Sequence, residues 1–389
     1  MTCKVDLAMM HDSGGPRRVK PMLERLGAKV WDPSKVVLIT DHYVPANDEE
    51  SRAIVRIARD WAAAAGIGHF YDAQGICHVV LPERGHLQPG MFAVGGDSHS
   101  PTGGAFAAYM FGIGATEMLG VLVTGEIWLK VPDTIVMQFD GRFGRGVAAK
   151  DAMLHLIGRF GMDGGRYQAL EYRGDAIRAL PMQERMTMCN MAAELGAQVG
   201  LIGSDEVTRQ YLDRDIEMLE SDADAAVLEH HRFDAAALAP QVAAPHSPAN
   251  ARPADEFRDV AIDLAYLGAC TGAKLEDLRM AAQVLKGKRA KTRLLVAPAS
   301  LRDQNAAAQE GTLRVLLDAG AELLPNACGM CAGYGGHLMP ESAVAISSTA
   351  RNFRGRMGAA SAQVYLASPY TVVASALAGR IRDPREALA

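Results

Sequence analysis

The sequence predicts an α/β protein in which helices cover mostly parallel sheets. Short runs of β-branched residues alternate with longer amphipathic segments, which is the pattern of α/β layers. Polar residues follow directly after several of these runs, and 389 residues are more than one hydrophobic core usually needs. We therefore expect two or three domains of the α/β class.

Two kinds of segment support this fold class in detail. The clearest strands are the short apolar runs at residues 36–40, 91–94, 294–296 and 343–346. Residues 54–65 and 275–285 carry apolar side chains at helical spacing, so we expect helices there. A new strand-like run begins after Pro132 and Asp133, which suggests a boundary at that point.

We divide the chain into three α/β domains and one linker. The first domain covers residues 1–131 and holds Asp-His and Asp-Ser-His motifs, and the second covers residues 132–233. Residues 234–255 are rich in Ala and Pro and are the expected linker. The third domain, residues 256–389, holds three cysteines and an arginine pair.

Composition excludes several classes of function. The formal net charge is -5 and no basic block stands out, which argues against a nucleic-acid partner. No stretch of 18 apolar residues and no apolar signal core at the start occur, so neither a membrane span nor secretion is expected. We expect a cytoplasmic enzyme whose six cysteines are thiols or metal ligands rather than disulfides.

Three cysteines carry the strongest chemical signal. Cys270 stands alone, and Cys328 and Cys331 form a C-x-x-C pair. Three thiolates are one fewer than the four that ligate a 4Fe-4S cluster, so one iron would stay open as a Lewis acid suited to dehydration. The residues alone leave two alternatives open, which are a redox pair and a zinc site completed by His337.

Polar clusters follow the predicted strands, where parallel α/β sheets bind ligands. Asp41 and His42 follow the strand at 36–40, and Asp97, Ser98 and His99 follow the strand at 91–94. Arg351 and Arg356 likewise follow the strand at 343–346, and Cys270 follows an apolar run around 260–264. A carboxylate beside a histidine can tune its pKa for proton donation.

Other functions can be written for the same residues. His42, His78, Asp97 and His99 could hold the metal of a hydrolase, but that leaves the cysteines without a role. A non-catalytic sensor or RNA binder is a second alternative, which the net charge does not favour. A nucleophile triad of Ser98, His99 and Asp97 is not expected, because consecutive side chains diverge and no G-x-S-x-G motif is present.

Several blocks together resemble the aconitase and isopropylmalate isomerase hydro-lyases, specifically the large subunit of their two-subunit forms. The order and spacing agree across nearly the whole chain. The matching blocks are residues 41–46 (Asp-His-Tyr-Val-Pro-Ala), 75–78 (Gly-Ile-Cys-His), 96–99 (Gly-Asp-Ser-His), 190–194 (Asn-Met-Ala-Ala-Glu), the three cysteines, and 351–356 (Arg-Asn-Phe-Arg-Gly-Arg).

The resemblance implies three α/β domains around a central cleft that holds an iron-sulfur cluster, without the swivel domain of larger relatives. It makes Cys270, Cys328 and Cys331 the ligands of a 4Fe-4S cluster with one open iron. The expected substrate-binding residues are Ser98, Asn190, Arg351 and Arg356. The expected catalytic residues are His42 in the leading role, with Asp41, His78, Asp97, His99 and Glu194.

The resemblance also implies a partner and a substrate class. In the wider family the base is a Ser in the swivel domain, so we expect a small subunit that carries both. The substrate is expected to be a hydroxy di- or tricarboxylic acid, most simply 3-isopropylmalate in leucine biosynthesis. Homoaconitate and methylated malates stay open, because Gly272 and Ala350 replace Asn residues usual in the family. Relatives are expected to carry about 30 further residues before Met1, judged from typical element lengths.

Overall fold

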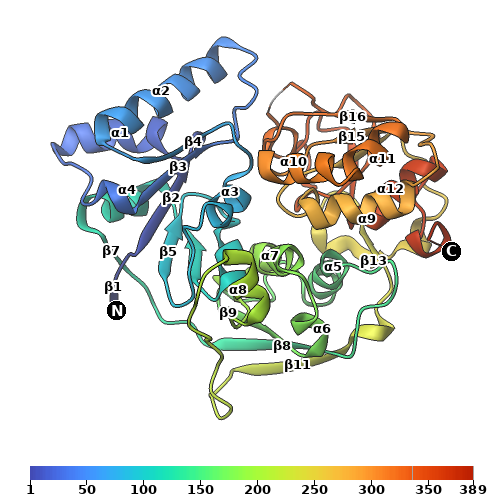
Figure 1. The fold of residues 1–389 in the computed structure, drawn as a ribbon, viewed down its shortest axis with the longest axis horizontal. Helices are drawn as coiled ribbons and strands as arrows, with labels where there is room; N and C mark the ends of the chain where they lie inside the picture. The colour runs from blue at the N-terminus through green and yellow to red at the C-terminus, as the bar shows by residue number, and fades with distance from the viewer. Residues whose placement is uncertain (335, 389) are drawn as a thin grey trace.

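The structure is a computed structural model that describes residues 1–334 and 336–388. Three successive parts of the chain, here called the first, second and third units, each build one main sheet with its own helices. Figure 1 shows the first unit in blue to teal, the second in green to yellow-green and the third in yellow to red. Within the described ranges, no helix combines the length and hydrophobicity that crossing a bilayer requires.

The first unit is a five-stranded parallel sheet with strand order β4-β3-β2-β5-β6. Its strands are β2 (Leu7–His11), β3 (Val36–Thr40), β4 (His69–Asp72), β5 (Phe92–Gly95) and β6 (Tyr109–Gly112), with β1 (Thr2–Lys4) and β7 (Glu126–Trp128) forming a separate pair. Its helices are α1 (Pro16–Leu26), α2 (Glu49–Ala65), α3 (Cys77–Glu83) and α4 (Ala115–Thr124).

Alternating residues of β2 explain why this sheet is covered on both faces. Ala8 and Met10 pack in a cluster with residues of α1, α2 and α4, whereas Leu7 and Met9 pack in the cluster that includes α3. A strand that is buried on both faces needs apolar residues at successive positions, as residues 7–10 of β2 and 36–39 of β3 provide.

The second unit is a four-stranded parallel sheet with strand order β10-β9-β8-β11. The strands are β8 (Thr134–Asp140), β9 (Ala169–Arg173), β10 (Val199–Leu201) and β11 (Glu229–Asp234). The helices are α5 (Ala149–Phe160), α6 (Asp175–Arg178), α7 (Met182–Asn190) and α8 (Glu206–Leu212). One continuous core joins this unit to the α3 face of the first sheet.

The third unit is a seven-stranded mixed sheet with strand order β13-β12-β18-β17-β14-β15-β16. The strands are β12 (Gln241–Ala243), β13 (Ala251–Pro253), β14 (Leu264–Leu267), β15 (Arg293–Val296), β16 (Ala321–Leu323), β17 (Val344–Ser347) and β18 (Gln363–Ala367). The helices are α9 (Leu275–Leu285), α10 (Leu301–Gln309), α11 (Thr312–Asp318) and α12 (Pro369–Ala378). Residues 234–255, which we expected to be a linker, therefore supply two antiparallel strands of this sheet.

Local details also differ from the sequence predictions. The helix expected at 54–65 begins earlier, because the Asp48 side chain caps it by accepting from the Ser51 amide at 2.7 Å. The apolar run at 260–264 is not itself the strand, which starts at Leu264, because the preceding Asp263 carboxylate accepts from the Val344 amide where pairing begins. The strand at 36–40 and the helix at 275–285 have the predicted bounds.

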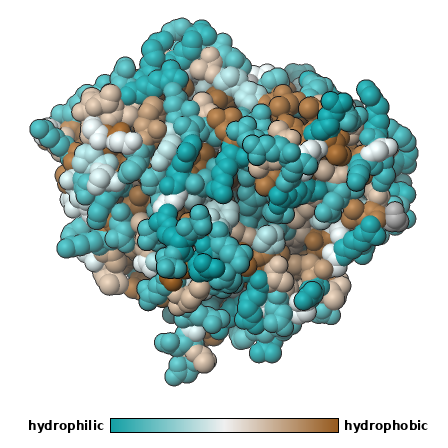
Figure 2. Space-filling model, viewed as in Figure 1, coloured by the Kyte–Doolittle hydropathy of each residue, from teal (hydrophilic) through white to brown (hydrophobic). Residues whose placement is uncertain are grey.

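Strand order explains how distant motifs meet. β3, β2 and β5 are neighbours in the first sheet, so the residues after their carboxyl ends emerge side by side. In the third sheet β14 and β17 are neighbours, so the turn after β14 lies beside the segment after β17. The face seen in Figure 2 is largely hydrophilic, with hydrophobic residues distributed between polar ones.

Candidate active site

A cavity of about 260 Å³ collects the predicted functional residues between the first and third units. Its lining residues are His11, Ser13, Gly14, Arg18, His42, Ile76, His78, Gly96, Asp97, Ser98, His99, Cys270, Cys328, Cys331, Ala332, Tyr334, Ala350, Arg351 and Arg356. The remaining predicted site residues, Asp41, Asn190 and Glu194, are fully buried and bond to members of this lining. The structure thus brings every predicted site residue together.

A larger groove of about 850 Å³ lies elsewhere, around β6 and β7. It is lined by residues such as Phe111, Trp128 and Tyr167, and its lining contains no histidine or cysteine. The smaller cavity is therefore the candidate active site, because it holds the acid–base and metal-binding side chains.

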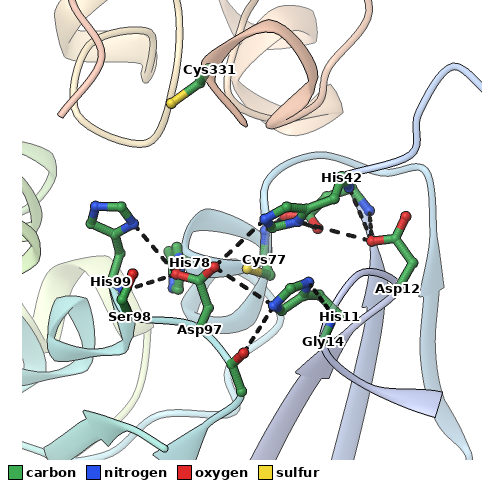
Figure 3. Close-up of polar contacts among 12 residues, drawn as sticks. His11, Asp12, Gly14, His42, Cys77, His78, Asp97, Ser98, His99 and Cys331 are labelled. Carbon is green, nitrogen blue, oxygen red and sulfur yellow. Dashed lines mark hydrogen bonds and ion pairs between the residues drawn. The ribbon is translucent and has the colours of Figure 1, made fainter. Parts of the chain in front are cut away.

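Asp97 is the centre of a histidine network on the first unit (Figure 3). Its carboxylate lies 2.8 Å from His78 Nε2 and accepts from the His99 amide at 2.8 Å. The other oxygen lies 3.6 Å from the Nε2 atoms of both His42 and His11. Burial opposes ionisation of Asp97, but the charge of His78 and hydrogen bonds from His42, His78 and His99 hold its pKa well below its usual range.

His42 is held as a cation between two carboxylates. Its Nδ1 lies 2.7 Å from Asp41 Oδ1, and the second Asp41 oxygen accepts from the Cys77 amide at 2.7 Å. Burial lowers the pKa of His42, but the adjacent charges of Asp41 and Asp97 outweigh it and raise that pKa well above 6.5. The His42 imidazolium therefore stays protonated at neutral pH while its Nε2 faces the cavity network.

The sequence analysis missed His11 and Asp12 at the end of β2. The Asp12 carboxylate accepts from three successive backbone amides, of Asp41, His42 and Tyr43, at 3.2, 3.0 and 2.8 Å. His11 stacks on His42 with ring centroids 4.1 Å apart. A usable signal was present, because this His-Asp pair follows an apolar strand just as Asp41 and His42 do.

Glu194 joins the histidine network to the third unit. Its Oε1 lies 3.0 Å from His99 Nε2 and accepts from Arg351 Nε at 2.7 Å. Arg351 also donates to Ser98 Oγ at 2.9 Å. Helix α7 ends at Asn190, and a short 3-10 turn at Met191–Ala193 then places Glu194.

The three cysteines form the opposite wall. Cys270 follows β14, Cys328 directly precedes the 3-10 turn at Gly329–Ala332, and Cys331 lies within that turn. Figure 3 shows Cys331 across from the histidine network. The hydrogen bond from Cys328 lowers the pKa of Cys331 to about 6, and Arg356 acts in the same direction, so its thiolate, the metal-binding form, is present at neutral pH.

These cysteines fit an iron-sulfur group better than one zinc ion. Within the described parts of the chain, no set of three ligand atoms lying within 4.8 Å of one another includes any of them. Zn–S bonds of about 2.3 Å in a tetrahedron would bring the sulfurs to about 3.8 Å. His337 lines a different small pocket, beside Tyr266, so it does not complete a zinc site with them.

Two buried oxygen atoms beside this wall also point to an absent ligand. Glu194 Oε2 and Asn190 Oδ1 have no hydrogen-bond partner among the described residues. The Asn190 amide nitrogen donates to Cys270 Sγ at 3.2 Å and to Thr102 Oγ1 at 2.8 Å. Buried polar atoms are normally paired, so these oxygens are arranged for a group that binds here.

Two arginines have free hydrogen-bonding capacity in the cavity. Arg356 donates through Nε to the Cys331 carbonyl at 3.0 Å, and no partner of its terminal nitrogens lies among the described residues. Arg18, which the sequence analysis did not single out, lines the cavity from α1, and its guanidinium makes no hydrogen bond or ion pair with the described residues. Guanidinium groups in this state suit carboxylate ligands.

Comparison with known proteins defines the class of this fold and site. The model of the aconitase family (aconitate hydratase) matches residues 1–379. The chain therefore belongs to the aconitase family, whose members are hydro-lyases that carry an iron-sulfur cluster. The predictions of the family, of the α/β fold and of a hydro-lyase are confirmed.

Individual relatives agree over nearly their full length. The chain is 42% identical over 394 residues to the 3-isopropylmalate dehydratase large subunit 1 of Methanopyrus kandleri, covering 99% of this chain and 94% of that one. It is 43% identical over 391 residues to the probable methanogen homoaconitase large subunit of Methanosarcina mazei, covering 99% and 100%.

A solved structure shares the fold at low sequence identity. Aconitase X of Thermococcus kodakaraensis, in its holo-form, superimposes with a TM-score of 0.50 and 13% identity. The match covers 90% of this chain and 84% of that chain, so the similarity extends across all three sheets.

Proposed function

We propose that this chain is the large subunit of a hydro-lyase that isomerises a hydroxy di- or tricarboxylic acid by dehydration and rehydration. The observation that carries the proposal is the pairing of two walls in one cavity. A carboxylate surrounded by four histidines faces three cysteines and two arginines. Proton donors and acceptors, metal ligands and carboxylate binders are the parts that such chemistry needs.

Cys270, Cys328 and Cys331 would hold a 4Fe-4S cluster with one iron left without a protein ligand. When bound, that group supplies a Lewis acid for a hydroxyl and a carboxylate of the substrate. The hydrogen bond of Asn190 to Cys270 would support one of the thiolates.

His42 acts as the general acid. It is a cation between Asp41 and Asp97, with its Nε2 side directed into the network of the cavity. Loss of a hydroxyl as water requires one proton, and Asp41 and Asp97 raise the pKa of His42 well above 6.5, so His42 carries that proton. Asp97 and His99 hold the departing water in place, and Glu194 orients His99 through the bond at 3.0 Å.

Arg351, Arg356 and Ser98 bind the substrate carboxylates. Arg351 is fixed by Glu194 and Ser98, so its fork is held in one orientation. Arg356 has its terminal nitrogens available. Bidentate contacts from such forks orient the carbon skeleton so that the leaving hydroxyl faces His42.

A small subunit supplies the base that removes the carbon-bound proton. The two relatives compared above are both named as large subunits, which supports a two-subunit enzyme. We propose that the small subunit closes over the cavity between the first and third units and brings its Ser there. We place this enzyme in the cytoplasm.

3-Isopropylmalate is the first candidate substrate, because most of the similar relatives are named for it. A homoaconitase-type tricarboxylic acid is the second candidate. Arg18 favours that alternative. It is a third arginine in the cavity beside Arg351 and Arg356, and its guanidinium has no partner among the described residues, so it suits a third carboxylate.

The test is an assay of the chain co-produced with its small subunit, under anaerobic conditions with iron. We expect turnover of 3-isopropylmalate or of a homologous tricarboxylic acid only when both subunits are present. Replacing Arg18 by Gln should weaken the binding of a tricarboxylic substrate by about tenfold and leave the binding of 3-isopropylmalate unchanged. No turnover of either acid by a complex that contains iron and sulfide would refute the proposed function.

A further inference from the structure

Lys150 lies in the first turn of α5, in the second unit, and its ammonium group is buried beneath the cysteine wall. The residue is 1% exposed. Its Nζ donates to Thr271 Oγ1 at 3.2 Å, to the Thr349 carbonyl at 2.6 Å and to the Ser348 carbonyl. All three donors of the ammonium are therefore used, and all three partners belong to the third unit.

Through these partners, Lys150 links the turn that contains Cys270 to the segment that leads to Arg351. Thr271 directly follows Cys270, and Ser348 and Thr349 directly precede Ala350 and Arg351. Thr271 Oγ1 also donates to the Ser348 carbonyl at 2.8 Å. Lys150 thus holds both segments at one point.

Packing at this point is too tight for a larger residue in the turn. A Cβ atom on Gly272 would lie 2.2 Å from Ser348 Cβ, so the turn can pass Ser348 only without a side chain there. The Ser348 hydroxyl accepts from the Gly268 amide at 2.9 Å. The carbonyl and hydroxyl groups that bind Lys150 are therefore held in place by close packing between the turn at Gly272 and Ser348.

The charge of Lys150 has no carboxylate partner. Of the described residues, none places a carboxylate oxygen within 4.0 Å of its Nζ. Burial lowers the pKa of Lys150 to about 7, and the groups that oppose this most are Cys331, Asp277 and Cys270. An unpaired buried charge is costly, so a nearby anion is expected to balance it.

Lys274 is the instructive contrast. It is equally buried and donates to the Cys270 carbonyl at 2.9 Å, but it also lies 2.7 Å from Asp277 Oδ2. Asp277 is therefore already paired. Cys331, whose pKa is lowered to about 6, is the anion left for Lys150, and Cys270 becomes a second one when it binds a metal as a thiolate.

We propose that Lys150 is a positioning residue whose buried charge is the counter-cation of the cysteine thiolates and of the iron-sulfur group that they hold. This inference rests on the proposed function. A fixed positive charge beside the cluster stabilises its more negative, reduced state and strengthens thiolate binding to iron.

Two substitutions separate charge from hydrogen bonding. Lys150→Gln keeps a donor and removes the charge, and Lys150→Met removes both while keeping a similar length. Lys288→Gln, at an exposed lysine, removes a charge far from the site as a control. The readouts are the rate of iron loss to a chelator and the reduction potential from a titration followed by electron paramagnetic resonance.

We expect both Lys150 variants to lose iron about tenfold faster than the wild type, because one nearby opposite charge changes the stability of a thiolate by about one pKa unit. We also expect a lower reduction potential, because the reduced, more negative cluster loses the charge that stabilises it. The control should match the wild type. A Gln variant with wild-type iron retention and potential would overturn the counter-cation role, even if the Met variant does not fold. Wild-type protein without iron or sulfide would instead overturn the proposed function, and this inference with it.

Discussion

The two walls of the cavity differ in how completely their polar groups are paired. On the first unit, Asp97 is surrounded by histidines and Asp12 by three backbone amides, so each carboxylate has its partners within the protein. On the facing side, Glu194 Oε2 and Asn190 Oδ1 have no hydrogen-bond partner among the described residues, and no carboxylate there lies within 4.0 Å of Lys150 Nζ.

This difference shows which wall has its polar groups paired before any ligand binds. The histidine wall is organised by the protein alone and can hold and donate protons as folded. On the cysteine wall, the buried positive charge of Lys150 is balanced only when an anionic group is bound.

Replacing Cys328 by Ser should remove the iron-sulfur group almost completely. A hydroxyl does not ionise near neutral pH, so it is a poor substitute for a thiolate ligand. We expect iron and sulfide per chain to fall close to zero, measured after anaerobic purification. Cys3→Ser, at a cysteine on β1 outside the cavity, is the control and should retain both. Unchanged iron in Cys328→Ser would remove this residue from the ligand set.

Asp97→Asn should damage the other wall without affecting the cluster. The substitution removes the charge that His42 and His78 face, and general acid catalysis contributes about 10²- to 10⁴-fold to rate. We expect turnover to fall within that range while the iron content stays normal. If iron were lost together with activity, the two walls would not be independent.

Arg356→Lys should weaken substrate binding much more than folding. A lysine cannot reproduce the planar fork, and a charged hydrogen bond contributes about 1.5–3 kcal/mol. We expect KM to rise at least tenfold with little change in melting temperature. Arg354→Lys is the matched control, because Arg354 is exposed on the same loop. Normal kinetics in Arg356→Lys would exclude this arginine from the substrate site.

Asp41→Asn should shift the pH dependence of the reaction. Burial opposes the raised pKa of His42, so Asp41 and Asp97 are what keep it protonated. Activity that needs the imidazolium is present below this raised pKa and is lost as pH rises through it. The stabilisation from the ion pair follows the same direction, because it is complete below the unfolded pKa of about 6.5 and disappears above the folded pKa.

Without the Asp41 charge, the alkaline limit of activity should move to lower pH by about one unit or more. A rate profile across pH measures the shift. An alkaline limit that does not move would show that His42 is not the acid, or that Asp97 alone sets its pKa.

The sequence predicted the first-unit motifs well because strand ends are visible in it. Asp41, His42 and Asp97 directly follow apolar runs, and parallel strands bring such positions to one edge of a sheet. The cysteines were predicted from their own pattern and from the family resemblance. His11 and Asp12 were missed although the same rule applies to them.

Other features depend on tertiary structure and had no local signal. The segment at 234–255 is rich in Ala and Pro, which are not typical of strands, and only pairing with β18 makes it part of a sheet. Arg18 and Lys150 look like ordinary surface lysines and arginines in the sequence. Their importance comes from which cavity or carbonyl groups lie around them, and spacing along the chain does not encode that.

The most direct test of the central claim is metal analysis of the chain purified without oxygen, together with its visible absorption spectrum. We expect nearly four irons and four sulfides per chain, as a three-cysteine 4Fe-4S site requires, and release of one iron on brief exposure to air. Stoichiometric zinc with no sulfide would contradict it, because the cysteine wall would then hold a different metal and the hydro-lyase mechanism would lose its Lewis acid.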